Sequence, residues 1–136
     1  MLATLGFTFH HIGVACRDIE AEAKAWLMLG YVAEAPDFED PIQQVRGRFL
    51  VGAGPRLELL MQAGPQSPIP GILRRDTKFY HMAYVGTAFD DAIAALRQKR
   101  CKITTDPAPA VAFGGRRIAF LILPNMNVIE LVEAEK

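Results

Sequence analysis

The sequence has few cysteines, no excess of either charge and no long apolar run. Two cysteines, Cys16 and Cys101, among 136 residues are too few for a disulfide scaffold and lack the Cys-x-x-Cys spacing of a zinc or redox site. Fifteen Lys plus Arg balance fifteen Asp plus Glu, so no basic surface for nucleic acid is expected. Apolar runs are shorter than the ~20 residues of a membrane-spanning helix, and residues 1–16 lack the Lys or Arg of a signal peptide. These absences predict a cytoplasmic protein without a nucleic-acid or membrane partner.

The composition is that of a folded domain. Hydrophobic residues make up 51% of the chain and charged residues 22%, which fits a packed protein and not a disordered one. A chain of this length predicts one domain, residues 1–136.

The chain repeats itself at an offset of about seventy residues. Residues 9–15 and 79–85 are both predicted to be strands with a histidine at the same point, and each is followed by a helical pattern. In the first helix Ile19, Ala23 and Trp26 recur at helical spacing, together with Leu27, and Gly30 is placed as a stop.

The second helix matches the first. Thr87 lies three residues before Asp90, which is a typical helix start, and Phe89, Ile93 and Leu96 lie on one face.

A hairpin is predicted in each repeat. Residues 48–51 and 56–60 flank a Gly- and Pro-rich turn, and residues 118–122 and 128–132 flank another. Residues 37–40, by contrast, are expected to form a solvated loop, from which Glu39 or Asp40 could reach the cleft as a second acid.

These patterns predict an α+β fold of two tandem βαβββ modules. The first module covers about residues 7–62, a Pro- and Gly-rich connector about 63–77, and the second module about 78–134. Neither half alone has enough core, so the two are expected to pack or join.

Two histidines and two glutamates occupy equivalent positions in the repeats. His11 and His81 lie in the two first strands, and Glu58 and Glu130 in the two last strands. Alternation along a strand puts each carboxylate on the face opposite its flanking aliphatic residues. If that face is open solvent, the glutamates need no special role, and a lone strand histidine is more often a packing residue than a ligand.

The second interpretation is an enclosed metal site. Leu60 and Val132 share the glutamate faces, and an enclosed carboxylate is costly without a cation or hydrogen bonds. A quasi-twofold between the modules would bring together His11, Glu58, His81 and Glu130. Mixed nitrogen and oxygen ligands suit one divalent ion such as Zn, Ni, Co, Mn or Fe(II), and the sequence does not choose among them.

The whole chain resembles the vicinal oxygen chelate superfamily, which includes glyoxalase I, methylmalonyl-CoA epimerase, extradiol dioxygenases and bleomycin-binding proteins. The motifs that carry the resemblance are residues 11–15 with the following Asp18-Ile19, residues 29–31, and residues 43–45. They are similar to the epimerase and glyoxalase I branch, although Gln44 replaces the glycine of a Gln-Gly-Val stretch.

The resemblance implies that the two modules form a cupped mixed sheet around a central cleft and that the protein is a metal-dependent lyase or isomerase. His11, Glu58, His81 and Glu130 match the family's metal ligands, and chelation of two neighbouring substrate oxygens would let a proton leave next to a carbonyl. Glu130 is the family-matched candidate for the base, with Glu58 as its symmetry partner. The implied substrate is a small molecule, a thioester or a 2-oxo compound.

Further contacts are expected around the site. Arg46, Arg48 and Arg116 would suit a phosphate, a carboxylate or a coenzyme A tail, or else lie on solvated hairpin faces. Gln43 is a further candidate for substrate contact. Relatives that associate through their sheets suggest a homodimer.

Two alternatives remain at this point. A metal-free binding protein of the bleomycin-resistance type would sequester an antibiotic or metabolite in the cleft. An extradiol-type dioxygenase would hold Fe(II) with His11, His81 and a carboxylate, and Glu58 would then be an additional ligand.

Overall fold

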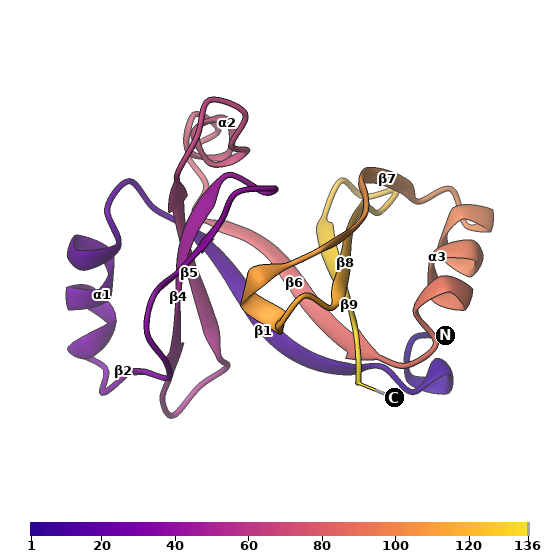
Figure 1. Ribbon diagram of the computed structural model, residues 1–136, viewed down its shortest axis with the longest axis horizontal. Coiled ribbons are helices and arrows are strands. Elements are labelled where there is room, and N and C mark those ends of the chain that lie inside the picture. The colour runs from indigo at the N-terminus through magenta and orange to yellow at the C-terminus, as the bar shows by residue number, and fades with distance from the viewer. Residues whose placement is uncertain (136) are drawn as a thin grey trace. The chain divides into compact units, whose positions relative to one another are not determined.

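A strand, a helix and an antiparallel hairpin occur in each repeat, as the sequence predicts. The computed structural model describes residues 1–135, which fall into two units. One unit is His11–Tyr80, called the first half here, and the other joins Met1–His10 to the segment that begins at His81, called the second half (Figure 1).

The first half contains one parallel and several antiparallel strand pairs. Its strands follow the order β2-β4-β5-β1, with β3 paired to β4, and only β1 and β5 are parallel. Its elements are β1 (Thr8–Ala15), α1 (Ile19–Leu27), β2 (Val32–Ala33), β3 (Phe38–Asp40), β4 (Val45–Val51), β5 (Leu57–Gln62) and α2 (Ile69–Leu73).

The second half has the same kind of arrangement. Its strands follow the order β6-β9-β8-β7, and β6 and β9 are parallel while the other pairs are antiparallel. Its elements are β6 (Phe79–Gly86), α3 (Phe89–Gln98), β7 (Lys102–Pro109), β8 (Arg117–Ile122) and β9 (Val128–Glu133), with short 3₁₀ turns at Ala3–Leu5 and Val111–Phe113. The predicted α+β class with two βαβββ-like halves and mixed strand pairing is therefore confirmed.

Helix α1 begins and ends as its sequence dictates, but its apolar stripe is narrower than expected. The Asp18 carboxylate accepts a hydrogen bond from the Ala21 amide at 2.7 Å, which caps the first turn. Gly30 has φ +84°, the left-handed conformation that ends helices. Ile19 and Ala23 are buried. The prediction for Leu27 was wrong, because 53% of this residue is exposed.

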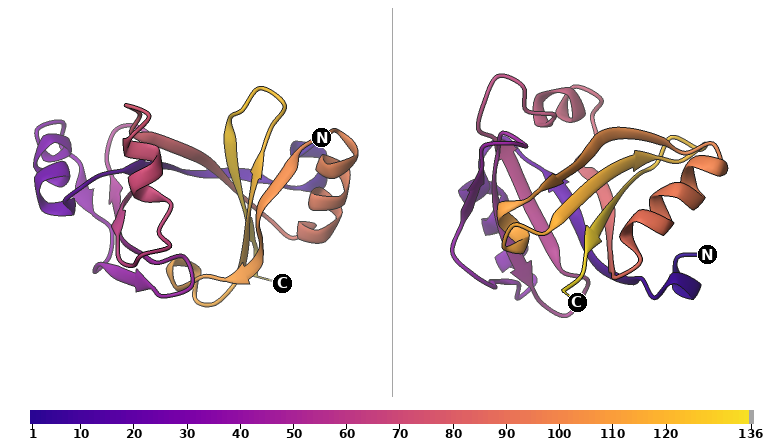
Figure 2. Two further views of the ribbon diagram at one scale, coloured as in Figure 1. Left: turned by 90° about the horizontal axis from the view of Figure 1, so that it is seen from above. Right: turned by 45° about the vertical axis from the view of Figure 1, so that its right-hand side comes forward.

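Helix α3 buries more of its surface. Phe89, Ala92, Ile93 and Leu96 are all buried and pack with Phe7 from the N-terminal segment in one core cluster. Figures 1 and 2 show the N-terminal segment beside α3.

The predicted start of α3 at Thr87 was wrong. Its N-cap is Ala88, with no side-chain cap hydrogen bond. Burial of Phe89 in the first turn thus positions this end of the helix, and a capping side chain does not.

Two helices cover opposite faces of the first half. Val14 and Leu59 face α1 and pack with Ile19. Ala15 and Leu60, one residue further along each strand, belong to a separate cluster with Ile69 of α2. Helix α2, which was not predicted, lies in the connector and covers one end of the Leu60 face.

Residues 37–40 are not the solvated loop that was expected. Phe38–Asp40 forms β3, which pairs with β4, and Asp40 is only 3% exposed. A side chain at Gly47 would meet the Phe38 ring, so glycine at this position allows β3 to approach β4.

No helix among residues 1–135 combines the length and the apolar character needed to cross a bilayer. The cytoplasmic location, the homodimer and the single-domain boundaries stay predictions.

Candidate metal centre

The first half holds a buried histidine against a buried glutamate. His11 on β1 and Glu58 on β5 are 0% and 5% exposed. The two strands are parallel, with Gly13 opposite Glu58, so His11 lies two residues from that pair on the same face. His11 Nε2 and Glu58 Oε2 are 2.9 Å apart, which brings both donor groups to one point.

The second half repeats this arrangement element by element. His81 on β6 and Glu130 on β9 are 3% and 2% exposed. Ala83 lies opposite Glu130 in the parallel register, and His81 again lies two residues before that position. His81 Nε2 and Glu130 Oε2 are 3.2 Å apart.

An aromatic edge contact is duplicated as well. Phe49 is opposite Glu58 across β4 and β5 and meets the His11 ring edge-on, with centroids 5.3 Å apart. Phe120 is opposite Glu130 and meets the His81 ring edge-on at 5.1 Å. These contacts restrict the rotation of each imidazole. Neither phenylalanine was predicted as a site residue, although their offset of 71 residues was the available signal.

The glutamates lie on enclosed faces. Leu60 and Val132, which share those faces, are 4% and 0% exposed. The interpretation of an open, solvated face is therefore wrong for both strands. A buried carboxylate without a compensating charge or hydrogen bond is unfavourable, so each pair requires its imidazole, a cation or both.

The donor set fits a metal ion. His11, Glu58, His81 and Glu130 are all buried and offer two imidazole nitrogens and two carboxylate groups that could hold one. Such mixed nitrogen and oxygen donors suit borderline divalent ions.

Two of the arginines expected near substrate have acidic partners. Arg48 donates from Nε to Asp37 Oδ1 at 2.6 Å and from Nη2 to Glu20 Oε1 at 2.5 Å, and Arg46 donates to Asp37 Oδ2 at 3.0 Å. The hydrogen bond from Arg48 holds the pKa of Asp37 below its usual range and raises the pKa of Arg48 in return.

These arginines also occupy the other face of β4. Arg46 and Arg48 alternate along β4 with Gly47 and Phe49. Glu58 of β5 lies opposite Phe49, so it shares the face of Gly47 and Phe49 and not that of the arginines. A substrate contact from either arginine stays a prediction.

Gln43 lies in the turn just before β4. The Asp40 carboxylate accepts hydrogen bonds from the Ile42 and Gln43 amides at 2.9 and 3.0 Å, which orders this turn. Gln43 Nε2 is buried with no hydrogen-bond partner within residues 1–135.

Gln44 takes the left-handed conformation, with φ +54°, which glycine adopts most easily. This explains why the similar Gln-Gly-Val stretch of the family has glycine at this position. The Gln44 side chain accepts a hydrogen bond from the Gln66 amide at 2.7 Å.

Arg116 is held within the second half. It donates to the carbonyl of Phe113 at 3.0 Å and to that of Glu133 at 3.1 Å. These bonds compete with any contact between Arg116 and a substrate. A substrate contact by Arg116 stays a prediction.

Comparison with known proteins identifies the class. The family model of the Glyoxalase/Bleomycin resistance protein/Dioxygenase superfamily matches residues 10–120. The chain therefore belongs to this superfamily.

Individual relatives show which branch of the superfamily the chain resembles. The chain is 28% identical over 133 residues to the ethylmalonyl-CoA/methylmalonyl-CoA epimerase of Cereibacter sphaeroides, covering 93% of this chain and 96% of that protein. A hypothetical protein from Bacillus halodurans C-125 has the same fold, with a TM-score of 0.80, 24% identity and 96% of both chains covered. A methylmalonyl-CoA epimerase variant of Streptomyces coelicolor in complex with 2-nitronate-propionyl-CoA gives a TM-score of 0.77 at 24% identity, covering 94% of this chain and 97% of that one. The glyoxalase-like fold is thus confirmed, and the chain's similarity is to the epimerase branch.

Proposed function

We propose that this protein is a metal-dependent isomerase or lyase that moves a proton next to the carbonyl of an acyl thioester or a 2-oxo compound. The observation that carries the proposal is the duplicated, buried pair: His11 with Glu58 at 2.9 Å and His81 with Glu130 at 3.2 Å. Similarity to an epimerase over most of both chains favours the isomerase.

The two pairs would together hold one divalent ion. When bound, the ion supplies a Lewis acid that stabilises negative charge on substrate oxygens, worth several kcal/mol. Four buried donors of two kinds support this proposal.

Glu130 would act as the base. Its carboxylate lies beside an imidazole in an almost fully buried position, where water does not compete for the proton. A positioned carboxylate base contributes about 10²–10⁴-fold to such a step. Glu58, in the same position of the first half, would return the proton in an epimerisation.

Strand β4 has no carboxylate where some epimerases carry one, so an epimerisation here would depend on Glu58 as the second group. On the face it shares with Glu58, β4 presents Val45, Gly47 and Phe49, none of which transfers protons. An epimerase needs a group on each side of a planar intermediate, so Glu58 is the acid or base that the first half offers on these two strands.

The substrate class comes from the relatives' names. Solved structures with this fold bind methylmalonyl-CoA and 2-nitronate-propionyl-CoA, and the curated relative acts on ethylmalonyl-CoA and methylmalonyl-CoA by its name. We therefore propose an acyl-CoA thioester with an acidic α-proton.

Deuterium exchange tests the reaction directly. In D₂O with one equivalent of divalent metal, the protein should exchange the α-proton of methylmalonyl-CoA, followed by NMR. Glu130→Gln should slow the exchange about 10²–10⁴-fold or more, because it removes both the proposed base and a proposed metal ligand, whereas Asp91→Asn, at an exposed position, should leave it unchanged.

Wild-type protein that binds metal but exchanges neither methylmalonyl-CoA nor a hemithioacetal would overturn the proposal. Oxygen consumption with a catechol would favour the dioxygenase instead. Saturable ligand binding by a protein that takes up no metal would favour the binding protein.

A further inference from the structure

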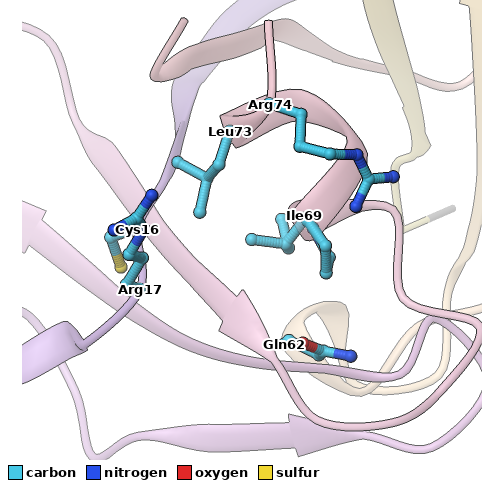
Figure 3. Close-up of a pocket in the computed structure, with 7 residues that line it drawn as sticks. Cys16, Arg17, Gln62, Ile69, Leu73 and Arg74 are labelled. Carbon is cyan, nitrogen blue, oxygen red and sulfur yellow. The ribbon is translucent and has the colours of Figure 1, made fainter. Parts of the chain in front are cut away.

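The first half contains a cavity that the proposed reaction does not use. It has a volume of about 330 Å³ and lies between α2 and the end of β1 (Figure 3). Pockets for small molecules begin at about this size. Its lining residues are Cys16, Arg17, Gln62, Ile69, Pro70, Leu73 and Arg74.

The cavity combines an apolar floor with two arginines. Leu73 and Ile69 project from α2 into the space, and Figure 3 shows Arg17 on one side of them and the Arg74 guanidinium on the other. No acidic residue is part of the lining, so both charges on this cavity are positive.

Neither guanidinium has an acidic partner among residues 1–135. Arg46, Arg48 and Arg117 all form ion pairs, whereas no ion pair involves Arg17 or Arg74 within the described part of the chain. Most of a guanidinium's affinity for a carboxylate comes from paired, charge-assisted hydrogen bonds, and that capacity is available at both ends of this cavity.

Arg17 also lines a neighbouring cavity, and the two acidic residues of that cavity have partners of their own. Glu22 forms an ion pair with Lys78, and the Asp18 carboxylate, still negative, accepts a hydrogen bond from the Ala21 amide. Burial, and secondarily Glu22, raises the pKa of the Cys16 thiol to about 11, so this side chain is neutral at physiological pH.

We propose that this cavity binds a small aliphatic dicarboxylate, with one carboxylate on Arg17, the other on Arg74 and the methylene chain over Leu73 and Ile69. Two guanidiniums on opposite sides of an apolar floor suit a ligand with an anionic group at each end and an apolar middle better than a compact anion such as phosphate. A fatty acid leaves one guanidinium without a partner.

The pocket is separate from the metal ligands of the first half. Gln62 lies on β5 four residues beyond Glu58, which corresponds to about 13 Å along a strand. We therefore expect diacid binding to be independent of the proposed reaction, and loss of metal through Glu130→Ala should leave it intact.

Calorimetric titration at low ionic strength tests the proposal with succinate, glutarate and adipate as probes and butyrate as the monoacid. At least one diacid should bind saturably and more tightly than butyrate. Arg17→Gln and Arg74→Gln should each weaken it about tenfold, while Arg75→Gln, the same charge change outside the lining, should not. Amide NMR shifts should centre on Arg17, Leu73 and Arg74.

Leu73→Trp provides a second variant, because the indole fills the cavity and keeps both charges. It should abolish diacid binding, with circular dichroism as the check of folding. The proposal is overturned if no diacid saturates, if Arg75→Gln weakens binding as much as Arg17→Gln, if Leu73→Trp binds normally, or if the NMR shifts centre on His11 and Glu58.

Discussion

The two halves share their chemistry but not their packing. Each places a histidine two residues before the position opposite a glutamate, in a parallel pair of strands, with a phenylalanine against the imidazole. The helices differ: Ile19 and Ala23 are the buried residues of α1, whereas α3 buries four side chains at the corresponding face. The repeat therefore preserves the donor groups and their strand register, while each half builds its core in its own way.

Because the donor groups are the same in both halves, their removal should cause equal losses of metal binding. Glu58→Gln and Glu130→Gln should each reduce metal binding to below detection, because each removes a charged donor from a buried site. Elemental analysis of the purified variants, with circular dichroism to confirm folding, measures this.

The metal content of the two variants also shows whether the glutamates are equivalent ligands. If Glu58→Gln keeps full metal content while Glu130→Gln loses it, the halves are not equivalent at the site. Full metal content in both variants would exclude the carboxylates as ligands.

The different packing of α1 and α3 predicts that substitutions at equivalent positions of the two helices change the stability for different reasons and by different amounts. Ile93→Ala should destabilise the protein by about 2–5 kcal/mol, since it opens a cavity in the α3 core. The equivalent position in α1 is Ala23, which is 4% exposed, so Ala23→Ile should cost about 1–3 kcal/mol through overpacking. Urea unfolding measures both values. A stabilising Ala23→Ile would show that the α1 core has unfilled space.

The aromatic contacts predict a smaller, symmetric effect. Phe49→Leu and Phe120→Leu should each weaken metal binding about two- to tenfold, because an aromatic contact worth about 0.5–1.5 kcal/mol no longer orients the imidazole. Competition with a metal chelator measures the affinities, and Phe79→Leu, at an exposed position, is the control. Equal affinities in all four proteins would show that the imidazoles are oriented without the rings.

The smallest expected effect is on the protein's stability at acidic pH, through Asp37 in the first half. Because the hydrogen bond from Arg48 lowers the pKa of Asp37, this carboxylate stabilises the fold above its usual pKa of 3.8 and loses that contribution as the pH falls through its lower folded value. Asp37→Asn should lower stability at pH 7 by at most about 1 kcal/mol and flatten the decline below pH 4. Unfolding curves at pH 7 and pH 3 measure this, with exposed Asp106→Asn as control. An unchanged slope between these pH values would contradict the assignment.

The sequence predicted the donor positions and the strand plan because both depend on periodicity. The alternation around Glu58 and Glu130, together with the seventy-residue repeat, was enough to place each carboxylate on the face opposite its flanking aliphatic residues, and the structure shows that this face is enclosed. Glycine at position 30 was likewise sufficient to end α1.

Other features depend on tertiary contacts that periodicity does not report. Helix α2 lies in a connector rich in Pro and Gly, and it is held by burial of Ile69 against Leu60. Strand β3 forms because Phe38 packs over Gly47. The partners of Arg48 come from residues 11 and 28 positions away, a separation at which local sequence patterns carry no information.

Metal stoichiometry tests the central claim most directly. Protein reconstituted with a divalent transition metal and freed of excess should hold one equivalent per chain, and His11→Ala and His81→Ala should each remove it. Two equivalents per chain would show that the pairs act separately, and none in the wild type would contradict the account of a metal centre.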